Sequence, residues 1–405
     1  MSELLVERNV QHSQSEEFPL VSFTVENGVT PKTERYEREQ LVRGDKSAKK
    51  YKETRLDDIV YNPANLKFGA ISRNKLGNAV FSPIYVTFEV KKDLVKPSFI
   101  EMVVKKKNFI QKALQYQQGT VYERMAVNTE DFTNLDVYIP NDLEQVKIGN
   151  YFENLDHLIT LHQRKCENLK KLKKFMLQKL FPQNGENVPK IRFTNFTDTW
   201  EQRKLSEIAL QTYGGGTPKT ANEEFWKGNI PWIQSSDLIE ERLFNVKPRK
   251  YISQEAISKS STKLVPQNSI TIVTRVGVGK LAFMPFSYAT SQDFLSLSEL
   301  KIEPKFAVYA LYKMMRLVSN EVQGTSIKGI TKDELLAKEI LIPDCEVQKK
   351  IGAYLHNLDN LITLHQSKCD NLKEVKKYML QNMFIWYFVY KLIRYVDFII
   401  VKNTN

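Results

Sequence analysis

Two His–Cys pairs are the residues of this sequence whose types and spacing most directly suggest chemistry. His162 stands four residues before Cys166, and His365 stands four residues before Cys369. Four residues make about one helical turn, so each pair would lie on one helix face, and two His with two Cys can hold a tetrahedral zinc ion. The alternative is that all four side chains pack between two paired helices. We expect the alternative and predict no metal site, because zinc needs four ligands that converge on one point.

Two further motifs are incomplete versions of catalytic ones. The stretch "RVGVGKL" (275–281) lacks the first Gly and the last Ser or Thr of a phosphate-binding loop, so we predict a tight turn between two strands. The stretch "YNPAN" (61–65) is similar to the Asn-Pro-Pro-aromatic element of base-modifying methyltransferases, but it lacks the second Pro and the aromatic residue. No glycine-rich cofactor loop follows a strand. We therefore predict that the chain is not an enzyme and has no cofactor of its own.

The charge of the chain indicates a polyanionic partner. Its 405 residues include 59 Lys and Arg against 47 Asp and Glu, which gives a net charge of +12 and a pI of about 9.2. This balance favours nucleic acid first and an anionic membrane surface second. Hydrophobic residues make up 42% of the chain, enough to bury sizeable cores, which argues against a disordered protein.

The sequence favours a cytoplasmic protein. Three cysteines are too few for a disulfide framework, and "MSELLVERNV" lacks the basic and apolar regions of a signal peptide. The apolar segment 384–401 carries Lys391, Arg394 and Asp397, charges that a membrane-spanning helix disfavours. We therefore expect no membrane association.

A long segment of the chain occurs twice as an internal sequence repeat. Residues 147–181 and 350–384, which lie 203 positions apart, are identical at 24 of 35 positions. Apolar residues recur in both copies at alternating steps of three and four, which predicts two long helices with a coiled-coil seam. The predicted seam positions are Leu155, Ile159, His162, Cys166 and Leu169 in the first copy, and Leu358, Ile362, His365, Cys369 and Leu372 in the second. We expect the two helices to pair antiparallel as a spacer with pseudo-twofold symmetry.

The two helices alternate with two globular segments of mixed α and β pattern. Each segment has the order strands, helix, Gly-Thr loop and a strand that ends in Ile-Pro. We predict helices at 97–116 and 306–322, and strands at 57–63, 79–90, 136–142, 269–275, 281–286, 293–300 and 339–345. The predicted fold class is therefore α+β, with two globular domains separated by two long helices. The predicted boundaries are 1–142 for the first globular domain, 143–184 for the first helix, 185–345 for the second globular domain, 346–384 for the second helix and 385–405 for an atypical hydrophobic tail.

Three stretches carry a resemblance to a known family. They are "VPKIRFTNFTDTWEQRKLSEI" (188–208), "GGGTPKTANEEFWKGNIPWIQSSDL" (214–238) and the duplicated helix with "LITLHQ". Over residues 3–384 the chain resembles the specificity subunit of type I restriction-modification enzymes. The resemblance implies two target-recognition domains that each read one half of a bipartite site in double-stranded DNA. It also implies methyltransferase subunits bound to the helices and restriction-translocase subunits in the same complex, with S-adenosylmethionine, ATP and magnesium held by those partners.

The chain departs from the family pattern at both ends. The segment 189–205, which opens the second globular domain, has no counterpart before the first, so we expect the first domain to be truncated at its start. Residues 385–405 are unlike the family. A partially inactive specificity subunit is therefore one alternative. A coiled-coil scaffold without DNA specificity is another, although it leaves two diverged domains and the +12 charge unexplained.

Candidate DNA-reading residues are polar and basic residues in predicted loops. Arg suits guanine and Asn or Gln suits adenine by bidentate hydrogen bonding, whereas Lys mostly binds phosphate. The candidates are Arg73, Asn74 and Arg124 in the first domain, and Arg249, Lys250, Arg275, Lys280, Gln292 and Lys328 in the second.

Overall fold

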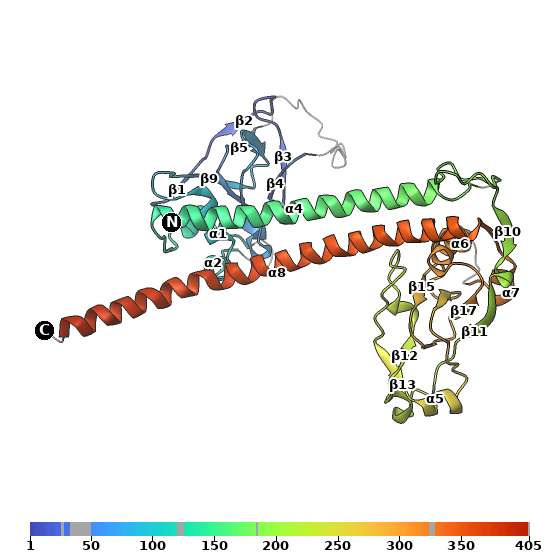
Figure 1. Cartoon of the computed structure of the whole chain (residues 1–405). Helices are drawn as coiled ribbons and strands as arrows, with labels where there is room; N and C mark the ends of the chain where they lie inside the picture. Colours follow the sequence, from blue (N-terminus) through green and yellow to red (C-terminus); the bar gives the residue numbers. More distant parts are fainter. Residues whose placement is uncertain (26–27, 33–49, 120–124, 184, 324–328, 404–405) are drawn as a thin grey trace. The chain divides into compact units, whose positions relative to one another are not determined.

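The computed structural model describes residues 1–25, 28–32, 50–119, 125–183, 185–323 and 329–403 (Figure 1). The chain divides into two compact units. The first unit consists of 1–162 with 367–405, and the second consists of 163–366. The sequence predicted the helices as segments separate from the globular domains. In the structure, by contrast, each unit combines one globular domain with part of each long helix.

The described residues of the first unit form three small sheets. Their strand orders are β1-β9-β6-β7, β2-β5-β8 and β3-β4. The strands are β1 (Leu5–Glu7), β2 (Gln11–His12), β3 (Val21–Thr24), β4 (Gly28–Pro31), β5 (Tyr51–Thr54), β6 (Ile59–Tyr61), β7 (Ile71–Arg73), β8 (Ala79–Phe81) and β9 (Val86–Val90). The helices before the first long helix are the 3₁₀ helix η3 (Pro63–Phe68), α1 (Pro97–Lys105), α2 (Lys107–Leu114) and α3 (Thr129–Thr133).

An aromatic core joins the main sheet of the first unit to its short helices. The rings of Tyr61 and Phe132 stack at 4.8 Å between centroids, and Phe88 stacks on Phe132 at 5.4 Å. Helix α1 packs on β7 and adds fully buried Phe99 and Ile100 to this core. The predicted helical segment 97–116 is thus confirmed as a pair of helices that meet at Lys106.

One predicted strand of the first domain is not formed. Residues 136–140, which precede the first long helix, are irregular, whereas their counterpart in the second domain is strand β18 (Glu339–Ile342). β18 pairs antiparallel with β10 (Glu201–Lys204). No described strand pairs with 136–140, and a strand gains its backbone hydrogen bonds only from a neighbour.

The second unit carries its core between a sheet and helix α6. The strand orders are β11-β17-β14-β15, β13-β12-β16 and β10-β18. Beyond β10 and β18 the strands are β11 (Ala209–Gly214), β12 (Ile230–Ile233), β13 (Lys250–Ile252), β14 (Ser269–Val273), β15 (Leu281–Met284), β16 (Ala289–Thr290) and β17 (Phe294–Leu300). The helices are η4 (Leu205–Glu207), η5 (Glu223–Trp226), η6 (Ser235–Asp237), α5 (Gln254–Lys259), α6 (Pro304–Gln323) and α7 (Lys332–Ala337).

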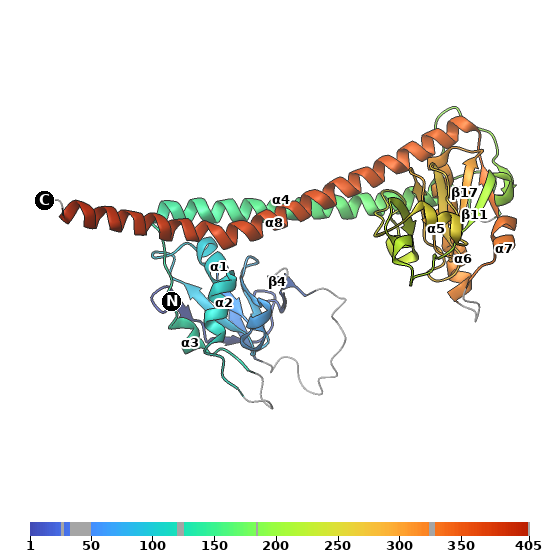
Figure 2. The ribbon, with the colours of Figure 1, turned by 90° about the horizontal axis from the view of Figure 1, so that it is seen from below.

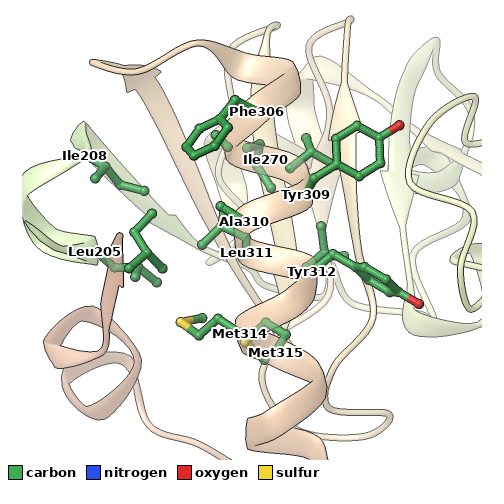
Figure 3. Close-up of a cluster of buried hydrophobic side chains, with 14 of the residues drawn as sticks. Leu205, Ile208, Ile270, Phe306, Tyr309, Ala310, Leu311, Tyr312, Met314 and Met315 are labelled. Carbon is green, nitrogen blue, oxygen red and sulfur yellow. The ribbon is translucent and has the colours of Figure 1, made fainter. Parts of the chain in front are cut away.

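Helix α6 is buried along most of its length because its apolar residues recur on the face turned to the sheet. Figure 3 shows Phe306, Tyr309, Leu311 and Met315 projecting from α6, with Ile270 of β14 among them. All five side chains are fully buried. The predicted strands at 269–275, 281–286 and 293–300 and the predicted helix at 306–322 are thereby confirmed.

The two long helices are α4 (Asp142–Lys179) and α8 (Cys345–Asn403). In the first unit, the early part of α4 and the later part of α8 run side by side (Figures 1 and 2). Lys376 Nζ binds Asp156 Oδ1 at 2.5 Å, and Phe152 and Leu380 belong to the same hydrophobic cluster. Helix α8 runs past the predicted end at 384.

In the second unit, the later part of α4 meets the early part of α8. Lys173 Nζ binds Asp359 Oδ1 at 2.5 Å. Lys173 and Asp359 occupy the duplicated positions of Lys376 and Asp156, so the same ion pair is made twice with donor and acceptor exchanged between the helices. In both units the residue number rises along α4 as it falls along α8. The predicted antiparallel pairing is thus confirmed within each unit.

The predicted seam positions are buried or half-buried in the structure. Leu155, Ile159, Cys166, Leu358 and Cys369 are all less than 9% exposed. The other predicted seam residues are half-buried, namely His162, Leu169, Ile362, His365 and Leu372. Two positions within the seam are lysines, Lys173 and Lys376, and each forms the ion pair described above. Of the helices that the structure describes, none combines the length and the apolar character needed to cross a membrane.

Candidate nucleic-acid interface

The loops of the second unit converge at one edge of its strands. β14 pairs antiparallel with both β15 and β17, and β17 pairs antiparallel with β11, so the ends of β11 and β14 meet the starts of β15 and β17. Hydrogen bonds tie these loops together, from Gly216 N to Thr290 O at 2.8 Å and from Ser291 N to Ile233 O at 2.9 Å. We name this surface the loop face and define it as residues 214–219, 234–237, 249–250, 274–280 and 291–293.

Close backbone approach shapes the loop face. A Cβ atom at Gly215 would lie 1.8 Å from Ser291 O, so no other residue fits where these two loops meet. Gly277 and Gly279 have φ angles of 92° and 101°. They form the turn between β14 and β15, which confirms that "RVGVGKL" is a tight turn.

Five of the six candidates in the second domain lie on the loop face. Arg249, Lys250, Arg275 and Gln292 are exposed, and Lys280 is half-buried. Lys328 lies outside the described residues. The structure therefore gathers residues that are spread over more than forty positions of sequence onto one basic surface, carried by paired strands.

Lys250 and Gln292 are each held by side-chain contacts within the loop face or beside it. Lys250 Nζ lies 5.5 Å from the ring centroid of Trp226 and 5.8 Å from that of Trp232, a cation–π arrangement. The hydroxyl of Thr217 donates to Gln292 Oε1 at 2.7 Å. This bond uses Oε1 of Gln292. The amide nitrogen of the same exposed side chain takes no part in it.

In the first unit, Asn74 is a structural residue. Its side chain is fully buried and donates to Gly77 O at 2.7 Å and to Arg55 O at 3.0 Å. Its Oδ1 accepts from the backbone N–H of Leu76 at 2.9 Å. An amide whose donors and acceptor are used by the protein cannot read a base, so Asn74 is withdrawn from the candidates.

Arg73 is also engaged within the first unit. Its guanidinium binds Glu101 at 3.1 Å, Asp57 at 3.0 Å and Glu153 of α4, and its side chain is 11% exposed. Arg73 thus fastens β7 to α1 and α4 and is withdrawn as well. Arg124 lies outside the described residues.

This ion cluster predicts a pH dependence. Burial raises the pKa of Glu101, but Lys105, Lys75 and Arg73 outweigh burial and lower it from 4.5 to about 2. Ionised Glu101 therefore stabilises the first unit above pH 4.5, and this contribution is lost as the pH falls toward 2. Glu101→Gln is expected to lower the urea midpoint of the first unit at neutral pH, by a difference from wild type that shrinks on acidification. Glu130→Gln, a change at an exposed residue, should show neither effect; a constant difference at all pH values would contradict the assignment.

Sequence reasoning missed a second candidate surface in the first unit. β6 and β7 are joined through η3, which occupies the same place in the strand order as the β14–β15 turn of the second unit. This connection exposes Asn65, Lys67 and Phe68, with Phe68 64% exposed. The repeated order of elements was the signal that could have identified it. No set of three His, Cys, Asp or Glu side chains placed to hold a metal occurs among the residues that the structure describes.

Comparison with known proteins matches this architecture. A family model described as the type I restriction modification DNA specificity domain covers residues 197–374. The type I restriction enzyme MjaIX specificity subunit of Methanocaldococcus jannaschii is 29% identical over 198 residues, which are 46% of this chain and 44% of that protein. The EcoR124I/EcoR124II specificity subunit of Escherichia coli is 31% identical over 193 residues, 43% of this chain and 46% of the relative. The chain thus spans less than half the length of these two relatives.

A solved structure extends the comparison over nearly the whole chain. The type I restriction-modification system S subunit from M. genitalium aligns with a TM-score of 0.62 at 13% identity, covering 94% of this chain and 93% of the other. At this identity the match demonstrates the fold alone. Residues 197–374 match the model of the type I restriction modification DNA specificity domain, and the resemblance found from the sequence is confirmed there.

Proposed function

We propose that this chain is the sequence-specific DNA-binding specificity subunit of a type I restriction-modification complex. Each of its two units would read one half of a bipartite target in double-stranded DNA. The loop face carries this proposal, because four cationic side chains and an exposed amide project from one end of a rigid set of strands. Lysines placed this way suit phosphate, and arginines and amides suit base edges.

The same proposal assigns the chemistry to other subunits. Methyl transfer, DNA cleavage and translocation would belong to methyltransferase and restriction-translocase partners, together with S-adenosylmethionine, ATP and magnesium. This chain would contribute recognition and assembly, as a non-catalytic protein of the cytoplasm.

A duplicated apolar surface supports the partner assignment. The first apolar patch consists of Leu158, Leu161, Val375 and Tyr378 in the first unit, and the second consists of Leu361, Leu364, Leu172 and Phe175 in the second unit. These residues are 38–64% exposed, and each member of one patch lies 203 positions from a member of the other. Each residue stands one position before a seam residue. In an antiparallel pair the same flank of both helices faces the same side, so each patch is continuous across α4 and α8.

Exposed apolar patches rimmed by polar residues mark protein interfaces. Two copies of one patch suit two copies of one partner, so we propose that each patch receives one methyltransferase subunit. The restriction subunits would join the complex thus assembled.

A salt-dependent mobility shift with duplex DNA of random sequence tests the DNA-binding proposal. The full-length chain should bind at low salt, with log K falling linearly against log[salt]. Lys280→Ala should reduce the slope by about 1 if Lys280 neutralises one phosphate. Lys338→Ala, outside the loop face, should leave the slope unchanged.

Absence of binding at low salt would favour the alternative of a coiled-coil scaffold. Binding without any sequence preference would favour a partially inactive specificity subunit. Exchanging residues 201–343 for those of another specificity subunit separates these alternatives further, because it should change one half of the target and leave the other half as it was.

A further inference from the structure

Asp237 is a fully buried carboxylate beneath the loop face. Its side chain is 0% exposed, and its Oδ2 accepts from the backbone N–H of Gln234 at 3.0 Å, which caps η6. Its Oδ1 lies 3.3 Å from the Nε of Arg249 but accepts no hydrogen bond, so the two groups form an ion pair. The Asp237 carboxylate therefore contacts both its own loop, 234–237, and the guanidinium of Arg249, which comes from another segment.

Arg249 is exposed despite these contacts. Its side chain is 65% exposed, and its Nη2 donates to the backbone oxygen of Ser236 at 3.2 Å. Nε and one hydrogen of Nη2 are thus used within the protein. The outer edge of the guanidinium, formed by Nη1 and the second hydrogen of Nη2, faces no protein partner among the contacts of the described residues.

The same short loop holds a second cation. Lys280 Nζ, from the turn between β14 and β15, lies 3.4 Å from Ser235 O. Residues 234–237 therefore bring together two cationic side chains from two different connections of the second unit. A buried acceptor that holds an arginine in one rotamer reduces the entropy lost when that arginine binds a ligand.

We propose that Asp237 is a positioning residue that presents Arg249 to a guanine in one half of the DNA target, with Lys280 beside it on a phosphate. The proposal rests on the proposed function and adds the residue that sets the specificity of one base pair. The free edge of Arg249 has two parallel N–H donors, the pattern that O6 and N7 of guanine accept in the major groove. A neutral amide at position 237 would keep the loop capped but would lose the charge that holds the guanidinium.

Selection of bound sequences from a pool of duplex DNA with a randomised core tests this inference on the full-length chain. Wild type should enrich a motif with at least one guanine in the half that the second unit reads. Arg249→Lys keeps the positive charge but loses the two parallel N–H donors of the guanidinium. The preference for that guanine should therefore fall by about 5- to 150-fold. Asp237→Asn should weaken the preference at the same position by up to about fivefold, the worth of an ion pair with one exposed partner.

Position and salt dependence separate a positioning role from a merely structural one. Asp237→Asn should leave all other positions of the motif and the salt slope unchanged, whereas Lys280→Ala should weaken binding equally for all sequences. Glu334→Gln removes a carboxylate from a comparable capping box, on α7 of the same unit, and should alter no position. An unchanged motif in Asp237→Asn, or a loss spread over the whole half-site, would overturn the inference while the proposed function stands. A wild-type chain without sequence preference would overturn both.

Discussion

Replacing Asp359 with Ala is expected to lower the free energy of unfolding of the second unit by about 3–5 kcal/mol. Asp359 Oδ1 binds Lys173 of α4 at 2.5 Å, and Asp359 Oδ2 accepts from the hydroxyl of Tyr309 of α6 at 2.5 Å. The side chain of Lys173 is 9% exposed, so the substitution leaves a buried ammonium group without its counter-charge. Removing one partner of such a pair costs far more than an exposed pair contributes, because the remaining charge stays desolvated.

Tyr309 links the ion pair between Asp359 and Lys173 to helix α6. Burial, together with the nearby Asp359 carboxylate, raises the pKa of Tyr309, so its hydroxyl remains protonated and donates to that carboxylate. Three elements, α4, α6 and α8, therefore meet at one carboxylate within the second unit. Tyr309→Phe keeps the buried ring and removes one hydrogen bond, so it should cost less, about 1–3 kcal/mol.

The duplication supplies a matched control. Asp156 pairs with Lys376 in the first unit as Asp359 pairs with Lys173, but Asp156 is 41% exposed. Asp156→Ala should therefore cost about 1 kcal/mol or less. Hydrogen exchange measured by mass spectrometry reports the stability of both units in one sample. Equal losses from Asp359→Ala and Asp156→Ala would show that burial does not set the strength of these pairs.

If each apolar patch receives one methyltransferase subunit, as we propose, charged substitutions in the two patches should remove these subunits from the complex one at a time. Leu158→Asp with Leu161→Asp places two carboxylates in the first patch, and Leu361→Asp with Leu364→Asp does the same in the second. An unpaired charge at the centre of an interface costs at least about 2 kcal/mol, or roughly 30-fold in Kd. Each double variant should therefore retain one partner copy, and the quadruple variant should retain none.

The subunit composition can be measured by native mass spectrometry, with methylation of target DNA as a second readout. Thr160→Asp with Thr363→Asp provides the control, because these exposed threonines also occupy duplicated positions on α4 and α8 but lie outside the patches. The quadruple variant should still bind duplex DNA at low salt, since the loop face is unaltered. Retention of both partner copies by the quadruple variant would remove the patches from the interface, and loss of both copies from one double variant would contradict two independent sites.

Features that depend on near neighbours along the chain could be predicted from the amino-acid sequence. The steps of three and four predicted both long helices and their seam, because side chains three and four positions apart share one helix face. Antiparallel pairing followed from two copies of one seam. The strands at 269–275 and 293–300 and the helix at 306–322 could be predicted equally well, because apolar runs of these lengths fit few other secondary structures.

Which polar residues lie on the surface could be seen only in the tertiary structure. Arg73 and Asn74 are neighbours in a predicted loop, yet one binds Glu101 and Glu153 and the other is fully buried against Arg55 and Gly77. Their partners come from distant segments, and the local sequence contains no information about which segment will approach.

The loop face depends on the tertiary structure for the same reason. Arg249, Arg275 and Gln292 come together because β11, β17, β14 and β15 pair in that order and because the loop at Gly215 contacts Ser291. The apolar patches became visible only when α4 and α8 were paired, since each patch takes residues from both helices. Lys173 interrupts the apolar seam in the sequence. In the fold its ammonium group is buried beside the half-buried carboxylate of Asp359, because a buried charge needs an opposite charge next to it.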